Sequence, residues 1–422
     1  MADYYLPMFE TCVKEAKVGS IMCTYNSLDG TPTCASSDLL QGILRDGWDF
    51  NEPYNYVVSD CDSIENIFDP HHFAQDIVEA AALGVNAGTD LDCGSTYDNL
   101  YKAVQQNLTT EATLDKSVTR LFAALVKVGF FDQPAEYNKL NWADVNTTKS
   151  QNIAYRAAVD GMTLLKNDGT LPLPSTASNV AVIGPWANVT DKMQGNYAGT
   201  APLLVNPLDV FRRKWRNVKY ARGTDIDTGD SSGFDEAIQA AKSSDYIVYM
   251  GGIDTSTENE GHDRKSIAWP GNQLDLVAKL SALGKPLVVI DDSQLLQNAK
   301  VNSIVWAGYP GQDGGDAVFD ILTGKASPAG RLPVTQFPAS YVDNNDILNM
   351  KLQPNNGIAG RTYMWYTGKP VLPFGHGLHY TNFSSTWKTT PSQSYSIQDL
   401  VSKAGGNLRS EFTTVTATIK NT

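Results

Sequence analysis

Hydrophobic and polar positions follow two alternating patterns along the first 130 residues. Helical spacing of apolar residues recurs in four segments, at 6–17, 36–48, 73–84 and 110–129. Short apolar runs that open into polar residues lie between them, at 18–26, 56–60 and 85–93. Strands that alternate with helices are typical of a parallel α/β sheet or barrel. Three such units make only part of an eight-stranded barrel, and a partial barrel would leave unpaired strand edges.

The polar residues that end these runs are candidates for an active-site edge. In parallel α/β folds the carboxyl ends of the strands form that edge, and the run 56–60 places Asp60 there. Asp60 could also be an ordinary cap of the turn that follows. Asp62 is the better candidate for a cap, because its spacing to Glu65 is that of a capping box. Position alone leaves both roles open for Asp60.

The second half of the chain predicts a second α/β region. A polar stretch at 130–150 precedes a predicted helix at 151–168. Strands are predicted at 179–184, 245–252, 285–290 and 303–308, with helices at 233–244 and 272–284 between them. A Pro- and Gly-rich segment follows, and 411–422 alternates as a strand would. We therefore predict domains at 1–130, 156–345 and 381–422, joined by linkers at 131–155 and 346–380.

A dense group of titratable side chains follows the apolar run 245–252. It comprises Asp254, Glu258, Glu260, His262, Asp263 and Arg264. A solvated charged loop would account for such a group. Alternatively, one of its glutamates pairs with Asp60 to supply the two carboxyl groups that glycosidic cleavage needs. Aromatic residues of the same region suit sugar stacking as well as ordinary packing, namely Trp186, Tyr197, Trp269, Trp306 and Tyr309.

Composition argues against several other classes of protein. The chain has 422 residues and a formal net charge of −13, and no basic cluster of the kind that binds nucleic acid is present in the sequence. No apolar run approaches the ~20 residues that span a bilayer, so no membrane association is predicted. His71 and His72 are adjacent and diverge, so no metal site is predicted. The glycines of 308–320 lack the phosphate-loop patterns and suit turns and close packing.

Cysteines and glycosylation motifs predict a secreted protein. All five cysteines lie in the first hundred residues; Cys23 and Cys34 bracket a turn-rich stretch and look pairable, and we expect Cys12 to be the free thiol. Together with the sequons, this clustering favours an oxidising, extracellular compartment. The sequence begins without a signal-peptide pattern, so we expect a leader that is absent from this chain. The sequons place glycan acceptors at Asn107, Asn146, Asn188 and Asn382.

Several long motifs occur in a characteristic order over nearly the whole chain. They include MCTYNSLDGTPTCA, VVSDCDSI, AGTDLDCG, VAVIGPWAN, ENEGHDRKSIAWPGNQLDLV and WAGYPGQDGGDAVFDILTGKASPAGRLPVTQFP. These motifs resemble glycoside hydrolase family 3, most closely its fungal β-xylosidases. The resemblance implies the C-terminal part of a (β/α)8 barrel, an α/β sandwich domain and the beginning of a fibronectin type III-like domain. It also implies a retaining exo-hydrolase that releases β-D-xylose from the non-reducing ends of xylo-oligosaccharides without a metal or organic cofactor.

The resemblance assigns roles to residues of the first region. Asp60 matches the nucleophile that forms the glycosyl-enzyme, and Tyr25 matches a tyrosine whose hydroxyl orients that carboxylate. Related β-glucosidases usually carry Trp after the nucleophile, so Cys61 favours the xylosidase branch. The resemblance also makes Cys93 the expected disulfide partner of Cys61, and it leaves Asp62 as a cap.

The resemblance places the acid/base glutamate on the loop 255–264. We prefer Glu258 and keep Glu260 as a close second. A retaining mechanism needs the two carboxyl groups about 5 Å apart. The acid must also keep its proton, which Arg264 would oppose if it touched the acid. We therefore expect Arg264 to pair with Asp263, and we predict substrate contacts for Tyr25, Cys61 and Arg264.

Three departures from the family pattern limit what the resemblance implies. About half of the barrel is absent upstream, the segment KPLVVIDDSQLL lacks a Gly-rich loop, and the third domain ends early. We therefore expect a chain truncated at both ends. The alternatives are a β-glucosidase or α-L-arabinofuranosidase of the same family, or an inactive fragment without half of the barrel. The sequence makes no prediction of oligomeric state.

Overall fold

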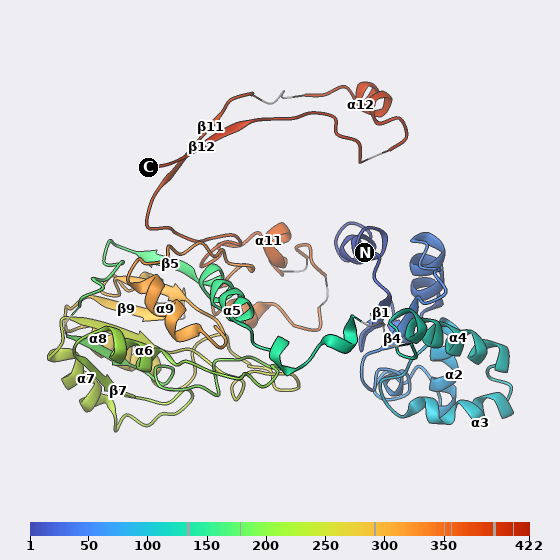
Figure 1. Cartoon of the computed structure of the whole chain (residues 1–422), viewed down its shortest axis with the longest axis horizontal. Coiled ribbons are helices and arrows are strands. Elements are labelled where there is room, and N and C mark those ends of the chain that lie inside the picture. The colour runs from blue at the N-terminus through green and yellow to red at the C-terminus, as the bar shows by residue number, and fades with distance from the viewer. Residues whose placement is uncertain are drawn as a thin grey trace. The chain divides into compact units, whose positions relative to one another are not determined.

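The chain folds into two compact units, Met1–Trp142 and Ala143–Thr422. Figure 1 shows the computed structural model, in which the first unit runs from blue to cyan and the second from green to red. The structure describes residues 1–132, 136–177, 179–290, 293–349, 351–355, 357–390, 394–407 and 409–422.

Two parallel strands form the centre of the first unit. They are β1 (Ser20–Cys23) and β4 (Tyr56–Ser59). The third run, predicted as a strand at 85–93, contributes only one parallel bridge, from Leu91 to Val58. The expected order of strand-like segments is confirmed, but the third is too short to be a strand.

Helices surround these strands in the first unit. The predicted helix 73–84 is confirmed as α2 (Ile77–Ala87), which begins where Asp76 accepts the N–H groups of Val78 and Glu79 and ends before Gly88 at φ +110°. Short β2 (Ser27–Leu28) and β3 (Thr31–Pro32) form a hairpin. The other helices are α1 (Leu6–Lys14), α3 (Leu100–Gln105), α4 (Glu111–Lys127), the π-helix η2 (Asp38–Gly47), and the 3-10 turns η1 (Thr33–Ala35), η3 (Glu65–Ile67), η4 (Thr96–Asn99) and η5 (Tyr137–Lys139).

A six-stranded sheet forms the second unit, in the order β5-β10-β9-β8-β6-β7. Strand β5 runs antiparallel to its neighbour and the other five are parallel. The four predicted strands are confirmed, as β6 (Val180–Ile183), β8 (Tyr246–Met250), β9 (Leu287–Ile290) and β10 (Ser303–Trp306). The family departure noted in KPLVVIDDSQLL falls partly on Asp291 and Asp292, which lie outside the described residues.

Two strands of this sheet were not predicted. The expected helix 151–168 is wrong at its end, because α5 stops at Gly161 and β5 (Thr163–Asn167) follows. A short apolar run such as that of β5 cannot be assigned to helix or strand by periodicity, and here pairing with β10 decides it. The second missed strand is β7 (Val218–Ala221), an edge strand paired with β6.

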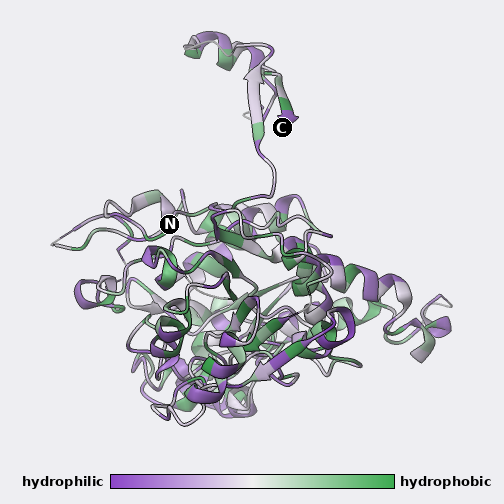
Figure 2. Cartoon of the chain, turned by 90° about the vertical axis from the view of Figure 1, so that its left-hand side faces the viewer, coloured by the Kyte–Doolittle hydropathy of each residue, from purple (hydrophilic) through white to green (hydrophobic). Residues whose placement is uncertain are grey.

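Both faces of the six-stranded sheet are buried. Val180 and Val182 of β6 belong to one apolar core, whereas Ala181 and Ile183 belong to the other, as the alternation of side chains along a strand requires. Helices α6 and α9 contribute to the first core, and α7 and α8 to the second. Figure 2 shows hydrophobic and hydrophilic residues alternating along the helices of the chain. Their bounds are α6 (Pro207–Lys214), α7 (Phe234–Lys242), α8 (Gln273–Ser281) and α9 (Gly314–Leu322).

The remaining elements of the chain are short. The predicted strand 411–422 is confirmed as β12 (Ala417–Asn421), which pairs antiparallel with β11 (Phe383–Trp387), and both strands are exposed. In the described part of the chain, no helix combines the length and the apolar character needed to cross a membrane. The other elements are α5 (Thr148–Gly161), α10 (Tyr341–Asn344), α11 (Thr362–Trp365), α12 (Ile397–Ala404), η6 (Trp142–Asp144) and η7 (Ser293–Gln297).

Candidate active site

Asp60 lies at the carboxyl end of β4, as predicted. Its backbone N–H donates to the carbonyl of Cys23 at the end of β1 (2.9 Å), which ties the ends of the two strands together. Its half-buried carboxylate accepts the N–H of Cys61 (Oδ1, 2.8 Å). This hydrogen bond fixes the orientation of the carboxylate relative to the turn that follows. The strand end therefore presents one anchored carboxylate of the kind a nucleophilic role requires.

Two disulfides flank Asp60, and both confirm the expected pairs. Cys61 is bonded to Cys93, and Cys23 is bonded to Cys34. Cys12 is free and exposed, also as expected. Because Cys61 both donates to Asp60 and is covalently tied to the segment after Leu91, the disulfide limits movement of the turn that carries the carboxylate.

Asp62 does not cap the following turn, so the capping-box prediction is wrong. The 3-10 helix η3 has no side-chain cap. Asp62 instead adopts φ +65°, a left-handed conformation, and its N–H donates to the carbonyl of Cys93 (2.6 Å). Its Oδ1 lies where a Cβ on Gly94 would approach within 2.9 Å. The hydrogen bond to the Cys93 carbonyl, rather than helix capping, determines the conformation of Asp62.

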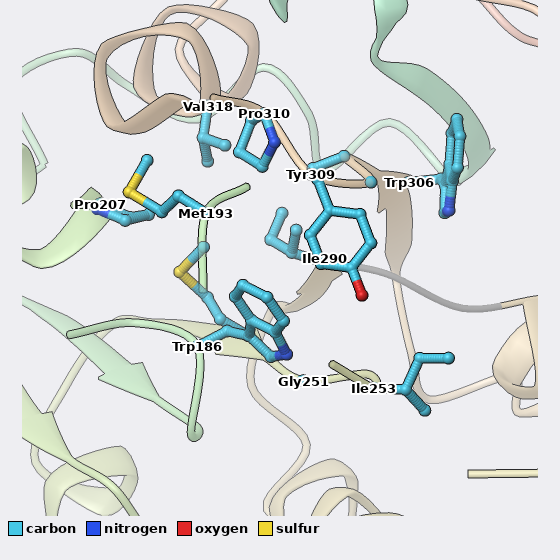
Figure 3. Close-up of a pocket in the computed structure, with 13 residues that line it drawn as sticks. Trp186, Met193, Pro207, Gly251, Ile253, Ile290, Trp306, Tyr309, Pro310 and Val318 are labelled. Carbon is cyan, nitrogen blue, oxygen red and sulfur yellow. The ribbon is translucent and has the colours of Figure 1, made fainter. Parts of the chain in front are cut away.

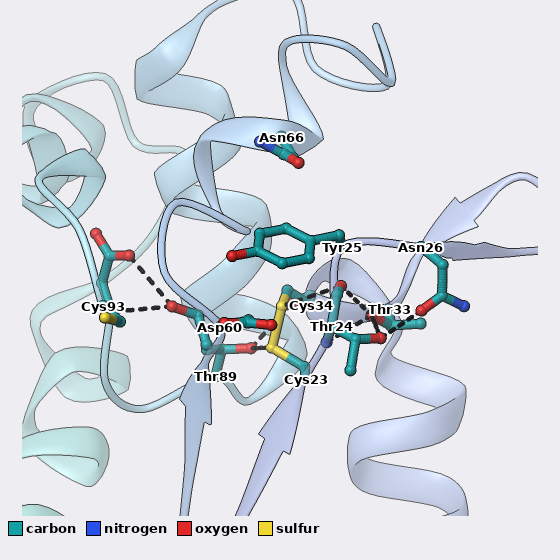
Figure 4. The surroundings of a disulfide bond; sticks show 12 residues. Cys23, Thr24, Tyr25, Asn26, Thr33, Cys34, Asp60, Asn66, Thr89 and Cys93 are labelled. Carbon is teal, nitrogen blue, oxygen red and sulfur yellow. Dashed lines mark hydrogen bonds between the residues drawn. A yellow bond between two sulfur atoms is a disulfide. The ribbon is translucent and has the colours of Figure 1, made fainter. Parts of the chain in front are cut away.

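Tyr25 lies two residues after the end of β1, and Asp60 lies one residue after the end of β4. Figure 4 shows both side chains near the Cys23–Cys34 disulfide. The Tyr25 backbone carbonyl is held by Nε2 of His71 (2.6 Å), and its ring is 39% exposed. His71 therefore has a structural contact that fixes the segment carrying Tyr25.

Buried polar groups support the other side of this strand end. Asp92 accepts the Ser59 hydroxyl (3.3 Å) and the N–H of Tyr97 (2.9 Å), so its carboxylate is occupied in structural contacts. The Tyr97 hydroxyl donates to the carbonyl of Thr89 (2.7 Å). Burial and the nearby Asp92 raise the pKa of Tyr97 well above its usual range, so this hydroxyl keeps its proton. Asp60 thus lies half-buried at this edge, beside an Asp92 carboxylate that is occupied in structural contacts.

The charged loop of the second unit is anchored by Asp254. This residue is 1% exposed, pairs with Lys192 and accepts the N–H of Ser256 (2.8 Å). Burial alone would raise the pKa of Asp254, but the hydrogen bonds from Lys192 and Ser256 lower it below its usual value. Asp254 is therefore an ionised anchor of the loop and does not suit the role of proton donor.

Glu260 lies at the tip of a tight turn. Asn259 and His262 exchange backbone hydrogen bonds (3.1 and 3.0 Å), so Glu260 and Gly261 are the two central residues of the turn. Gly261 has φ +75°, which a glycine adopts readily. The side chain of Glu260 is exposed, and no ion pair or hydrogen bond of its carboxylate is recorded with the described residues.

Glu258 is engaged by Arg264, which corrects the expected pairing of Arg264 with Asp263. The Arg264 Nε donates to Oε2 of Glu258. The same guanidinium reaches the carbonyl of Ile267 (3.5 Å). Asp263 is exposed, one position before the arginine. The Glu258 carboxylate is therefore occupied by the Arg264 guanidinium.

Arg264 also lines a cavity of about 360 Å³ together with Trp269, Trp306 and Phe337. Trp269 is 7% exposed, so it belongs mainly to the core. The sequence placed these tryptophans near strand ends or loops; Trp306 is the last residue of β10, and Trp269 lies in the loop before α8. Within the described residues, no group of three or more His, Cys, Asp or Glu side chains could hold a metal ion.

Sequence reasoning missed the contacts that hold these residues in place. Lys192 lies 62 positions from Asp254, and Arg45 lies 45 positions from the buried Asp90 that it pairs with (2.9 Å). No local pattern marks pairs so distant in sequence. The sequence did signal that Asp90 and Asp254 need partners, because a charged side chain buried among apolar residues requires a group of opposite charge.

The two parts of the candidate site belong to two domains of one enzyme family. Residues 1–124 match the glycosyl hydrolase family 3 N-terminal domain, and residues 162–380 match the glycosyl hydrolase family 3 C-terminal domain. The chain therefore belongs to glycosyl hydrolase family 3. Asp60 lies in the first match, and Glu258 and Glu260 lie in the second.

Similar sequences are fungal proteins with a common description. The probable exo-1,4-beta-xylosidase bxlB of Aspergillus terreus is 52% identical over 398 residues, covering 92% of this chain and 52% of its own length. The protein of the same name from Aspergillus fumigatus is 48% identical over 436 residues, covering 100% of this chain and 56% of its own length. The chain thus spans about half the length of the curated relatives it matches.

Solved structures show the same family fold. The GH3 exo-beta-xylosidase XlnD, solved with a xylobiose aziridine activity-based probe, has 47% identity and a TM-score of 0.88 over 93% of this chain and 54% of its own. A b-glucosidase, EmGH1 from Erythrobacter marinus, has 31% identity and a TM-score of 0.78 over 90% of this chain.

Proposed function

We propose that this chain carries the catalytic residues of a retaining, exo-acting glycoside hydrolase that releases β-D-xylose from xylo-oligosaccharides. The observation that carries the proposal is the position of Asp60. It follows a parallel strand, accepts the Cys61 N–H, and stands beside the Cys61–Cys93 disulfide. The similarity to relatives described as exo-1,4-beta-xylosidases supports xylose as the sugar.

The proposed chemistry uses two carboxyl groups in turn. The Asp60 carboxylate attacks the anomeric carbon while a glutamic acid gives its proton to the glycosidic oxygen, and the bond between that carbon and oxygen breaks. The leaving sugar departs as an alcohol. The same glutamate then removes a proton from water, which attacks the anomeric carbon and frees xylose and the Asp60 carboxylate.

Glu260 is our preferred acid/base residue over Glu258. The carboxylate of Glu258 is held by its ion pair with Arg264, whereas a general acid must direct its proton at the glycosidic oxygen of the substrate. Glu260 lies exposed at the tip of the Asn259–His262 turn, where its carboxyl group is available to a substrate. The proposal thus reverses our order of preference within the loop, and the exposed position of Glu260 supports the second of the two predicted candidates.

The finer domain description is also part of the proposal. The first unit would be part of a (β/α)8 barrel, with β1, β4 and the Leu91 segment as three of its strands. The six-stranded sheet of the second unit would be the sandwich domain, and β11 with β12 would belong to a fibronectin type III-like domain. The two disulfides and four sequons support secretion, with xylo-oligosaccharide as the partner.

Covalent trapping tests the nucleophile. The chain is incubated with a 2-fluoro-xyloside that carries a good leaving group, and the labelled peptide is mapped by mass spectrometry. We expect the label on Asp60 and none in Asp60→Ala. A label on another carboxylate would reject the nucleophile, and the absence of turnover and label alike would reject catalysis by this chain. Asp115→Ala, at an exposed position of α4, is the matched control.

Hydrolysis of aryl β-xyloside, β-glucoside and α-L-arabinofuranoside tests the specificity. Faster turnover of either competitor would reject the preference for xylose.

Glu260→Gln should lower kcat/KM on xylobiose by about 10²–10⁴, the usual contribution of a general acid. Glu258→Gln should change it less than about tenfold, because the role of Glu258 in this proposal is to hold Arg264. The opposite order of the two variants would return the assignment to Glu258.

A further inference from the structure

A cluster of basic side chains lies at one edge of the six-stranded sheet. Six of the 33 basic residues fall in the run 212–222, and no carboxylate interrupts the segment 210–224. The formal net charge of −13 conceals this run, so the expectation that the chain has no basic cluster does not hold here. We call the six residues the basic edge patch: Arg212, Arg213, Lys214, Arg216, Lys219 and Arg222.

The fold brings the basic edge patch together at the border of the sheet. Helix α6 ends at Lys214, a short turn carries Arg216, and β7 follows as the last strand of the sheet, paired with β6. Arg212 of α6 lies over the ring of Tyr220 in β7, 6.0 Å from the ring centroid. Burial raises the pKa of Tyr220, and the charges of Arg222 and Arg212 oppose this shift. Both arginines therefore lie near the same ring.

Most cations of the patch face solvent, and few carboxylates partner them. Five of the six residues are exposed, and Lys219 is half-buried. Asp316 is shared by Arg213 and Lys214, at 3.6 and 3.7 Å. Asp225 pairs with Arg222. Within the described residues, these two carboxylates are the ion-pair partners of six cations, which leaves the patch positively charged.

The patch begins at the end of the sheet that lies away from the candidate site. A cavity of about 320 Å³ is lined by Trp186 after β6, Gly251 after β8 and Tyr309 after β10, as Figure 3 shows. This cavity and the charged loop therefore lie at the carboxyl ends of the parallel strands. Arg216 and the last turn of α6 precede β7, which is parallel to β6, so they lie at the opposite, amino-terminal end.

Structural roles account for only part of the patch. A cation in the last turn of a helix stabilises the helix dipole, which suits Lys214. A lysine on an edge strand hinders pairing with another sheet, which suits Lys219. Neither role requires Arg216, in the turn between them, or Arg222, after the strand. Arg216 is exposed and makes no ion pair or hydrogen bond within the described part of the chain, so its guanidinium is available to a ligand.

The positions of these cations suit an extended polyanion. Arg216 and Arg222 stand beyond the two ends of β7, whose four residues span about 13 Å. A single small anion is too short to contact both, whereas charged groups on successive units of a polymer reach them together. Arginine also suits carboxylates, because its planar guanidinium donates two parallel hydrogen bonds to one carboxylate.

Charge density favours a polysaccharide over a nucleic acid as this polymer. Duplex DNA carries one charge per about 1.7 Å of its axis, and a protein with a net charge of −13 repels so dense a polyanion. An acidic polysaccharide carries at most one carboxylate per sugar ring, so the repulsion is weaker. The two disulfides fit an extracellular compartment, where such polymers occur. The choice of a polysaccharide also rests on the proposed function, which acts on sugar chains.

We propose that the basic edge patch binds an acidic polysaccharide, a chain of sugars that carry carboxylates, laid along β7 between Arg216 and Arg222. Arg212 and Arg213 contact further carboxylates from the last turn of α6. The patch attaches the protein to the polymer and takes no part in hydrolysis.

Calorimetric titration of the whole chain with polygalacturonate tests the proposal. We expect saturable binding with a dissociation constant on the order of 10⁻⁴ M in about 50 mM salt. Binding should weaken at least about tenfold in about 200 mM salt, because contacts with several cations release counterions. Methyl-esterified polygalacturonate has the same backbone without the charges and should not bind. Absence of saturable binding by the acid form, or equal binding of the ester, would overturn the proposal.

A triple variant of the patch locates the binding. Arg212→Gln/Arg213→Gln/Arg216→Gln removes three of the six cations at exposed positions, so the fold should be retained. Polygalacturonate should bind to it at least about tenfold more weakly, with a smaller dependence on salt, because fewer counterions are released. Unchanged affinity in this variant would place the polymer elsewhere on the protein and reject the proposal.

The matched control removes the same charge at other exposed positions. Lys116→Gln/Lys149→Gln/Lys279→Gln alters α4, α5 and α8. We expect less than about a twofold change in affinity, because charges far from the patch are screened by salt. Equal weakening in the two triple variants would show that the net charge of the chain, and not the patch, determines binding.

Two further measurements separate other partners from the polysaccharide. Tighter binding of a short duplex DNA than of polygalacturonate at the same salt concentration would identify a nucleic acid and overturn the proposal. Sedimentation velocity that shows dimers of wild type, lost in the patch variant, would identify a second copy of the chain instead. Polygalacturonate contains no xylose, so its binding does not depend on turnover. Asp60→Ala should bind it as wild type does, and loss of hydrolysis in that variant would bear on the proposed function alone.

Discussion

The two units stabilise their sheets by different means. The six-stranded sheet is buried on both faces by apolar side chains, with alternate residues of each strand in two cores. The first unit has two short two-stranded sheets, and its smaller core is supplemented by two disulfides and by the buried Asp90. Apolar burial is distributed over many residues, whereas cross-links and buried ion pairs concentrate the stability in a few. We therefore expect single substitutions to affect the first unit more.

Exposed apolar residues strengthen this contrast. Helix α4 carries Val118, Phe122 and Val126 at intervals of four residues, so they share one face, and each is at least half exposed. In the second unit the covering helices bury their apolar faces against the sheet. The first unit thus gains less from burial per residue and depends more on specific interactions.

Asp90→Ala should have the largest effect on stability. Asp90 accepts from Arg45 (2.9 Å), Arg120 (2.9 Å), Ser117 (3.0 Å) and the N–H of Val57 (2.9 Å), and its carboxylate is fully buried. Without it, Arg45 is left buried and unpaired, at a cost of about 3–5 kcal/mol. Burial and Arg120 already lower the pKa of Arg45, and Asp90 is the group that opposes this shift.

Hydrogen exchange, measured for individual peptides, shows separately how Asp90→Ala affects the stability of each unit. Exchange should rise throughout 1–132 and stay unchanged in the sheet of the second unit. Asp254→Ala is the comparison variant, because Lys192 has a 34% exposed side chain and can be solvated by water. Equal destabilisation by Asp90→Ala and Asp254→Ala would mean that the first unit does not depend more on buried ion pairs than the second.

Removing the Cys61–Cys93 disulfide should have the second largest effect. The bond closes 32 residues, and in the chain-entropy account a loop of this length contributes about 3–4 kcal/mol. Cys61→Ser/Cys93→Ser should therefore lower the unfolding midpoint of the first unit in denaturant and leave that of the second unit in place. Cys12→Ser, which removes the exposed free thiol, is the control. A shift of both transitions together would show that the units unfold cooperatively.

The same contrast explains what the sequence could predict. Four strands of the second sheet were found because apolar runs such as those of β8 and β9 are buried on both faces. Strand β5 was missed because its Thr163–Asn167 run continues a helical pattern, and tertiary pairing with β10 overrode it. Positions set by local pattern were predictable, whereas positions set by distant partners were not.

The candidate site shows the same division. Asp60 could be placed from the end of its strand, and the pairing of Cys61 with Cys93 from the family resemblance. The conformation of Asp62 could not, because a contact with Cys93 determines it. The partner of Arg264 was also mistaken, since sequence adjacency favoured Asp263 over a residue six positions away. The conformation of the loop decides whether Arg264 pairs with Asp263 or with Glu258, and the pattern of apolar residues does not predict loop conformation.

Acidification should have the smallest effect, and it should act on the second unit. The pKa of Asp254 is lowered in the folded state, whereas in the unfolded chain it is about 3.9. The ion pair with Lys192 thus contributes stability above about pH 4, and this contribution is lost as the pH falls through the lower folded pKa. We expect about 1 kcal/mol or less, because Lys192 is partly exposed. Denaturant unfolding of the second unit, followed by tryptophan fluorescence from pH 7 to about pH 3, should show this loss in wild type and not in Asp254→Asn. An identical pH dependence in the two proteins would assign the acid sensitivity of the sheet to other carboxylates and remove Asp254 as the anchor of the charged loop.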